Sequence, residues 1–164
     1  MKFFKNSQEG FTFVELTVVL AILLVLLTLV SVFVDPISKI KKARDNTRLT
    51  DLATLERAIN EFMLDNGRYP DYEDTLRVST SLPSGSSNLT NSNLGWIYDD
   101  FSRCLDKQPI DPTNNNEFFY SYMRTPTSYE LNARLEFYTE EMINDGGDND
   151  EIYEIGNNLN IIPL

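Results

Sequence analysis

The longest hydrophobic pattern in the chain runs from Phe11 to Val34 and contains one charged residue, Glu15. Residues 16–34 carry no charge, and 19 such residues meet the length needed to cross a bilayer as a helix. The whole run of 24 residues would measure about 36 Å at about 1.5 Å per residue. The rest of the chain has too little apolar sequence to bury such a helix. We therefore predict a hydrophobic membrane-spanning helix over residues 11–36.

A second, amphipathic helix is predicted over residues 37–66, where apolar residues recur at intervals of three, four and seven. This stripe comprises Leu52, Leu55, Ile59, Phe62 and Met63. Pro36 lacks the backbone N–H and predicts a kink or local opening between the two helices. Asn66-Gly67 predicts the end of the second helix, with Gly67 in the left-handed position after the last turn.

The remaining residues, 67–164, predict a head with a small antiparallel sheet packed on the second helix. A Ser/Asn/Gly-rich stretch over 79–95 predicts a long surface loop, and residues 95–98 (Gly-Trp-Ile-Tyr) an apolar anchor after it. Strand-like runs occupy 118–123 and 129–136, with a hairpin turn at Pro126, and a third strand is predicted near 152–155. The predicted fold class is α+β.

Charge is distributed unevenly over the 164 residues, whose net charge is −11. Residues 1–57 carry a net charge of +2 and residues 58–164 a net charge of −13. The acidic balance argues against nucleic-acid binding, which needs cations to displace counterions. The absence of His excludes His-dependent catalysis and His-ligated zinc, and a single cysteine, Cys104, excludes an intrachain disulfide.

Glu15 is the unusual residue of the hydrophobic run, because a carboxylate is costly near the centre of a bilayer. Its position near the end of the run permits a simple explanation, in which the carboxylate reaches the membrane interface. A functional explanation needs a cation, and none lies within the run. Cleavage after Gly10 would create an amino group on Phe11, about one helical turn from Glu15. That amine and the carboxylate could pair within a chain or between neighbours.

The first ten residues, MKFFKNSQEG, form a short leader with Lys2 and Lys5. A secretory signal peptide also begins with basic residues, but its apolar core is shorter and ends at a small-residue cleavage site. Gly10-Phe11-Thr12-Phe13-Val14-Glu15-Leu16, between this leader and the hydrophobic run, resembles the class III signal of type IV pilins and pseudopilins. The resemblance implies that a prepilin peptidase removes residues 1–10 and methylates the amine of Phe11, and that Glu15 acts in assembly.

The carboxyl-terminal half strengthens this resemblance. A helix ending Asp-Asn-Gly-Arg-Tyr-Pro, a Pro-x-Asp-Pro turn, a Tyr-rich hairpin and a Gly/Asp tail are similar to the major pseudopilin of type II secretion. The resemblance implies a pilin-like fold and a structural subunit that polymerises through its first helix into a type IV pilus or a secretion pseudopilus. The single Cys104 departs from the pilins that carry a disulfide and favours the pseudopilin-like group.

Partners and location follow from the same resemblance. It implies contacts with other copies of the chain, the prepilin peptidase, an inner-membrane assembly platform with its ATPase, minor pilins, and membrane lipid before assembly. The leader is expected in the cytoplasm and the head outside. A count of basic residues alone would reverse this orientation, because the second helix begins with a cluster of them. That cluster, Lys39, Lys41, Lys42, Arg44 and Arg48, could contact lipid headgroups or acidic neighbouring heads.

Two other functions remain open at this point. A DNA-uptake pilin would use residues 39–48 to contact phosphate, although the acidic head opposes this. A membrane-anchored enzyme would need a catalytic constellation, and the sequence offers none that stands out.

The acidic tail is a candidate metal site. Residues 136–154 include eight acidic residues and no basic one, and the turn over 145–151 concentrates oxygen donors of the kind that calcium prefers. The spacing is not that of an EF-hand. Pseudopilins of the resembling type hold calcium in their carboxyl-terminal loop, which points to Asp145, Asp148 and Asp150 as ligands. A solvated acidic loop is the alternative.

Overall fold

The structure is a computed structural model, and it describes residues 10–163, without the side chains of residues 31–34. The leader therefore lies outside the described residues, except for Gly10. The chain divides into two compact units, Met1–Lys39 and Ile40–Leu164, which we treat separately. We call the second one the globular unit.

The first unit contains helix α1, Phe13–Val34, as the hydrophobic run predicts. Within the described residues, one helix is long and apolar enough to cross a membrane, and its 18-residue window Phe13–Val30 has a mean hydropathy of 2.9. The helix ends at Asp35, which adopts a left-handed conformation with φ of 35°. The predicted break next to Pro36 is thereby confirmed.

Helix α2, Pro36–Asn66, begins at the proline, where a missing N–H costs no helical hydrogen bond. It ends as predicted, since Gly67 has φ of +69° and donates its N–H to the carbonyl of Met63. Four residues of the predicted apolar stripe are buried and Met63 is half-buried, so the stripe is the face that covers the sheet.

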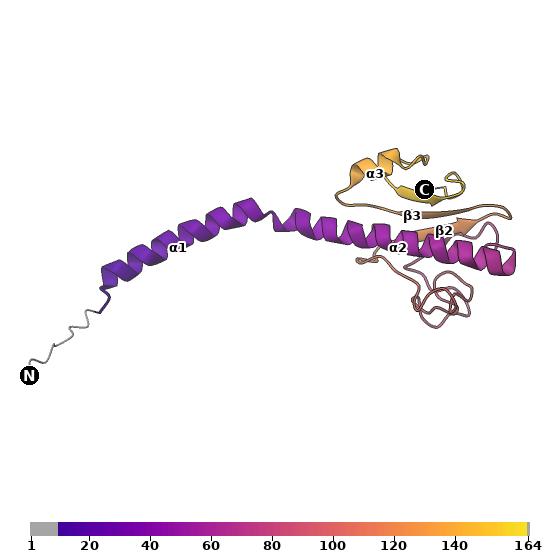
Figure 1. The fold of residues 1–164 in the computed structure, drawn as a ribbon, viewed down its shortest axis with the longest axis horizontal. Coiled ribbons are helices and arrows are strands. Elements are labelled where there is room, and N and C mark those ends of the chain that lie inside the picture. Colours follow the sequence, from indigo (N-terminus) through magenta and orange to yellow (C-terminus); the bar gives the residue numbers. More distant parts are fainter. Residues whose placement is uncertain (1–9, 164) are drawn as a thin grey trace, which may run out of the picture. The chain divides into compact units, whose positions relative to one another are not determined.

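The sheet is antiparallel, with the strand order β1-β2-β3-β4, and lies beside α2 (Figure 1). Its strands are β1 (Arg77–Val78), β2 (Tyr120–Arg124), β3 (Tyr129–Ala133) and β4 (Tyr153–Gly156). The three predicted strands are confirmed within a few residues, and so is the hairpin turn, which Thr125 and Ser128 close. Strand β1 and the short helix α3, Thr139–Asn144, were not predicted.

The core lies between α2 and the sheet face that carries three buried tyrosines, Tyr120, Tyr122 and Tyr129. Each hydroxyl finds a partner, as burial requires: Tyr120 donates to Asp51, Tyr122 donates to the carbonyl of Pro70, and Tyr129 accepts from Asn60. The predicted anchor is confirmed, because Trp96 is fully buried and donates to the carbonyl of Pro109 at 2.7 Å. The loop 79–110 is thereby tied to the core.

Candidate assembly site

Glu15 has a partner in the uncleaved chain, and that partner is Thr12. The carboxylate Oε2 accepts both the backbone N–H and the hydroxyl of Thr12, each at 2.8 Å, while Thr12 Oγ1 accepts the N–H of Glu15 at 3.2 Å. This is a capping box at the start of α1. It was not predicted above, although Thr-x-x-Glu before an apolar run is its sequence signature.

Gly10 and Phe11 lie just before this capping box and are open to a partner. Phe11 is 90% exposed, and a Cβ added at Gly10 would meet nothing within 4 Å. The fold of the described chain therefore does not require glycine at position 10. A requirement for glycine there would have to come from something that binds the segment.

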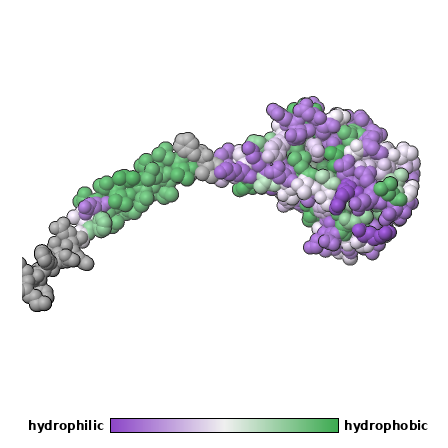
Figure 2. Space-filling model, in the orientation of Figure 1, coloured by the Kyte–Doolittle hydropathy of each residue, from purple (hydrophilic) through white to green (hydrophobic). Residues whose placement is uncertain are grey.

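The surface of α1 is almost entirely apolar (Figure 2). Its described side chains are all exposed as far as Val30. The hydroxyls of Thr17 and Thr28 donate to the carbonyls of Val14 and Val25, three residues earlier. The hydroxyls of these two threonines are thus satisfied within the helix, as a lipid environment requires.

The basic cluster at the start of α2 is partly turned inward. Arg48 is fully buried and bonds to three carboxylates: Asp111 through Nε at 2.6 Å, and Asp45 and Glu136 through Nη1, each at 2.8 Å. Arg44 pairs with Glu136. We call these five residues the Arg48 cluster. The expectation that the whole basic segment 39–48 faces lipid, neighbouring heads or phosphate is therefore wrong for Arg48, whose burial is stabilised by these pairs.

The Arg48 cluster fastens two distant segments to α2. Asp45 is fully buried and accepts the backbone N–H groups of Glu136, Phe137 and Tyr138, which follow strand β3. Asp111 brings in the turn between the long loop and β2. Hydrogen bonds from the guanidinium of Arg44, and then from Arg48, lower the pKa of Glu136 to about 2. The carboxylate thus stays ionised in ordinary conditions.

The acidic loop after α3 is organised around a residue that the sequence analysis did not single out. Glu154, on β4, is buried, and its Oε2 accepts the N–H of Asn149 at 3.3 Å. Asp145 faces it, since its two oxygens accept the N–H groups of Gly147 and Glu154, each at 2.8 Å. Burial, with the nearby charges of Glu130, Asp145 and Asp148, raises the pKa of Glu154 to about 7.

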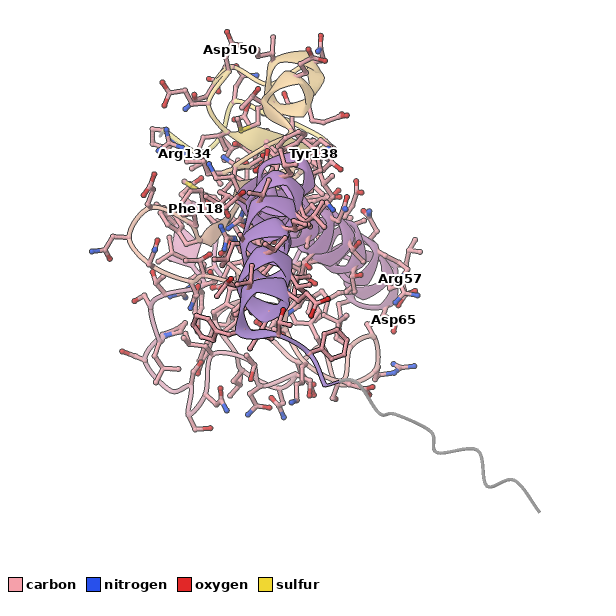
Figure 3. The ribbon with its side chains drawn as sticks, turned by 90° about the vertical axis from the view of Figure 1, so that its left-hand side faces the viewer. Arg57, Asp65, Phe118, Arg134, Tyr138 and Asp150 are labelled. Carbon is pink, nitrogen blue, oxygen red and sulfur yellow. The ribbon has the colours of Figure 1, made fainter. Side chains whose placement is uncertain are left out.

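The predicted calcium ligands behave differently from one another. Asp145 is half-buried and engaged as described, whereas Asp148 and Asp150 are exposed (Figure 3 labels Asp150). In residues 10–163 no three Cys, Asp or Glu side chains lie close enough together to hold a metal ion. Glu154 nevertheless suits a cation, because it is a buried carboxylate among like charges. It packs closely against Gly147, where an added Cβ would lie 1.5 Å from its Oε2. Glu154 and Asp145 are the residues that fit such a role best.

Comparisons with known proteins agree with this organisation. The family model described as type II secretion system (T2SS), protein G, matches residues 36–153, and the prokaryotic N-terminal methylation motif matches residues 5–31. The chain is similar to three proteins named type II secretion system core protein G. That of Klebsiella pneumoniae is 39% identical over 52% of this chain and 60% of its own length. That of Pseudomonas aeruginosa is 28% identical over 93% and 96%, and that of Aeromonas hydrophila is 34% identical over 68% and 71%. No solved structure matches.

Proposed function

The chain belongs to the family of type II secretion system protein G, and we propose that α1 assembles it into the pseudopilus of that system once residues 1–10 are removed. It is a structural subunit, and its precursor is anchored in the inner membrane by α1. Membership in this family favours the secretion pseudopilus over a surface pilus.

The observation that carries the proposal is the almost entirely apolar, exposed surface of α1, with the single acidic residue Glu15 in its first turn. Such a helix leaves lipid at low cost only if it moves directly into another apolar environment, which the packed helices of neighbouring subunits provide. In that environment an unpaired carboxylate would be costly, whereas a pair formed by Glu15 and the Phe11 amine of a neighbour neutralises both charges. The pair also fixes the axial register between subunits.

The role of Glu15 is tested by two substitutions that separate charge from capping. Glu15→Gln keeps an acceptor for the Thr12 N–H but removes the charge, and Glu15→Ala removes both. We expect both variants to insert in the membrane and lose the leader, and neither to form fibres visible by electron microscopy. Glu9→Gln, in the leader, is the control and should assemble normally. Normal fibres from Glu15→Gln would refute the charge pairing and leave only a capping role.

Processing is tested at Gly10. Since the described chain has room for a side chain there, Gly10→Leu should fold normally and keep the leader, which intact-mass measurement detects. A Gln8→Ala control should lose its leader and gain a methyl group on Phe11. A Gly10→Leu protein that is cut between residues 10 and 11 would contradict the assignment.

The partners follow from this role. The prepilin peptidase, the assembly platform with its ATPase and the minor pilins are proposed to contact the precursor, and a second copy is the partner in the fibre. What supports these partners is the family and the N-terminal motif. The same proposal gives the chain no catalytic role and no nucleic-acid partner. The burial of Arg48 and the pairing of Arg44 leave less positive charge for phosphate than the sequence indicates.

Calcium binding in the acidic loop is a separate proposal. We propose that Asp145, Asp148, Asp150 and Glu154 supply its oxygen ligands, and that the ion stabilises the loop by neutralising their repulsion. The melting temperature of the full chain in detergent should rise with about 1 mM calcium but not with magnesium, in line with extracellular calcium modules. Asp148→Asn should reduce that rise, whereas Glu140→Gln, outside the loop, should not. An equal response to both metals would refute a specific site.

A further inference from the structure

Two lysines at the start of the globular unit, Lys41 and Lys42, stay outside the Arg48 cluster. Arg44 and Arg48 bind carboxylates of the same unit, whereas neither lysine forms an ion pair with a described residue. Lys41 is half-buried and Lys42 is exposed. The positive charge of the two lysines is therefore not neutralised within the unit.

An exposed aromatic residue lies against one of these lysines. The Lys42 ammonium lies 4.2 Å from the centre of the Phe137 ring, and that ring is 38% exposed. Tyr138 (labelled in Figure 3) packs edge-on against Phe137, with the ring centroids 5.4 Å apart. The face of a ring attracts an ammonium group without removing its charge, so the N–H groups of Lys42 still suit an anion.

The buried Asp45 holds the aromatic pair beside the lysines. Its Oδ2 accepts the backbone N–H groups of Phe137 and Tyr138, at 2.7 Å and 3.1 Å. Asp45 follows Lys42 by three residues on α2, so the lysine and the aromatic pair are fixed at the same turn of the helix. The fold thus builds one surface at the start of this unit. We call it the Lys42 surface, and it comprises Ile40, Lys41, Lys42, Phe137 and Tyr138.

The length of the chain keeps this surface close to lipid. Helix α1 is the membrane anchor and ends at Val34, six residues before Ile40 and eight before Lys42. Eight residues of helix measure about 12 Å, and the headgroup layer of a bilayer is roughly 5–8 Å thick on each side. The four-carbon stem of a lysine spans much of the difference. The Lys42 surface therefore stays within reach of the headgroups while α1 spans the membrane.

The residue types of the Lys42 surface suit a membrane interface. Lysines next to a spanning helix bind the phosphates of anionic lipids, and aromatic rings prefer the level of the headgroups. Ile40 adds an apolar side chain that is 54% exposed. The nearby carboxylates of the Arg48 cluster are buried and paired, so they do not repel the lipid. Exposed negative charge begins again at Glu140, on α3, and this limits the surface.

We propose that the Lys42 surface docks the globular unit of the precursor on anionic phospholipid headgroups. The lysines bind lipid phosphate, and Phe137 and Tyr138 lie among the headgroups. Because α1 already provides the anchor, this contact adds orientation: it holds the start of the globular unit at the membrane before assembly. The contact does not depend on fibre formation.

Fluorescence quenching in vesicles tests the proposal with the full precursor. In a Cys104→Ser background, Thr139→Cys carries a fluorophore on an exposed residue next to Tyr138. The vesicles contain lipid with a nitroxide on the headgroup, in phosphatidylcholine alone or mixed with phosphatidylglycerol. We expect strong quenching in the mixed vesicles and weak quenching in phosphatidylcholine, and high salt should remove the difference.

A second label position shows whether the docking is oriented. Leu64→Cys is suitable, because Leu64 is 85% exposed and lies about 30 Å further along α2 than Lys42. Its fluorophore should be quenched weakly in both kinds of vesicle. Equal quenching at positions 64 and 139 would overturn the proposal, since the unit would then have no preferred orientation.

Charge variants identify the contact. Lys42→Gln should lower the ratio of docked to undocked protein about fivefold, which is the contribution of one lysine near an anionic surface. Lys42→Arg should preserve the ratio. Lys107→Gln is the matched control, because it removes the same charge from an exposed lysine of the long loop and should change nothing.

The remaining outcomes are equally decisive. Quenching at position 139 that is the same in neutral and anionic vesicles, or that Lys42→Gln leaves unchanged, overturns the proposal. Quenching that rises with the number of protein copies per vesicle assigns the surface to a neighbouring globular unit and also overturns it. The assay uses unassembled precursor, so these results leave the proposed polymerisation untouched, and fibres seen by electron microscopy decide that question separately.

Discussion

Replacement of Arg48 by methionine is the most informative perturbation of the globular unit. Methionine is unbranched, flexible and uncharged, so the change removes the guanidinium while the thioether fills much of the space. It leaves the Asp45, Asp111 and Glu136 carboxylates without their shared cation. Removing one partner of a buried ion pair is far more costly than replacing the whole pair by apolar groups.

The magnitude follows from the donors that each carboxylate retains. Asp45 keeps three backbone N–H groups, Asp111 keeps those of Thr113 and Asn114, and Glu136 keeps Arg44. This partial compensation places Arg48→Met within the range for a broken buried pair, about 3–5 kcal/mol, and not above it. For a unit of this size the melting temperature should fall by roughly 10–20 °C.

Urea unfolding of the full chain in detergent, followed by the fluorescence of Trp96, measures this change. The indole is fully buried and bonds the carbonyl of Pro109, two residues before Asp111, so it reports on the segment that Arg48 holds. Arg103→Met is the control, because Arg103 is exposed and should change stability by less than about 0.5 kcal/mol. A loss below about 1 kcal/mol in Arg48→Met would refute the view that the cluster fastens these segments.

Three further predictions concern the same unit and the same assay. Because the pKa of Glu136 is lowered to about 2, its pairing with the arginines stabilises the fold above about pH 4.5, and this stabilisation should be lost as the pH falls towards 2. A free energy of unfolding that stays constant between these pH values would contradict the stabilising role of Glu136. Gln108→Leu should cost about 2–6 kcal/mol, since the buried amide satisfies both the N–H and the carbonyl of Ile97 at 2.9 Å, and wild-type stability would exclude that role. Gly147→Ala should destabilise the acidic loop by about 1–3 kcal/mol, because the new Cβ would overlap Glu154; an unchanged urea midpoint would show that Glu154 can move aside freely.

The features that were predictable from sequence are those encoded over short stretches. Helix α1 follows from one hydrophobic run, and the end of α2 follows from Gly67. The assembly segment at Gly10, Phe11 and Glu15 is contiguous as well, and its residues remain predictions about processing and pairing. The capping box of Thr12 and Glu15 is equally local, since its two residues are three positions apart.

The features that were not predictable depend on contacts between distant segments. In the sequence, Arg48 looks like one more solvent-facing cation of a basic stretch. Its burial becomes favourable because Asp111 and Glu136 approach it, and these residues lie 63 and 88 positions away in the chain. Glu154 reads as the last of many acidic residues, and the register of β3 with β4 places it opposite Asn132 on a covered face of the sheet.

The same distinction explains why charge patterning was the least reliable signal in this chain. A charged residue at the surface contributes little to stability, so sequence places few limits on where it occurs. A charged residue in the interior is retained only with all its partners, and those partners are chosen by topology. In this fold the two loops that flank the sheet return to the start of α2, and Asp45 and Arg48 bind both of them. In the basic segment that was expected to face lipid, DNA or a neighbour, both arginines therefore bind carboxylates of the same chain, and the Lys42 ammonium lies 4.2 Å from the centre of the Phe137 ring.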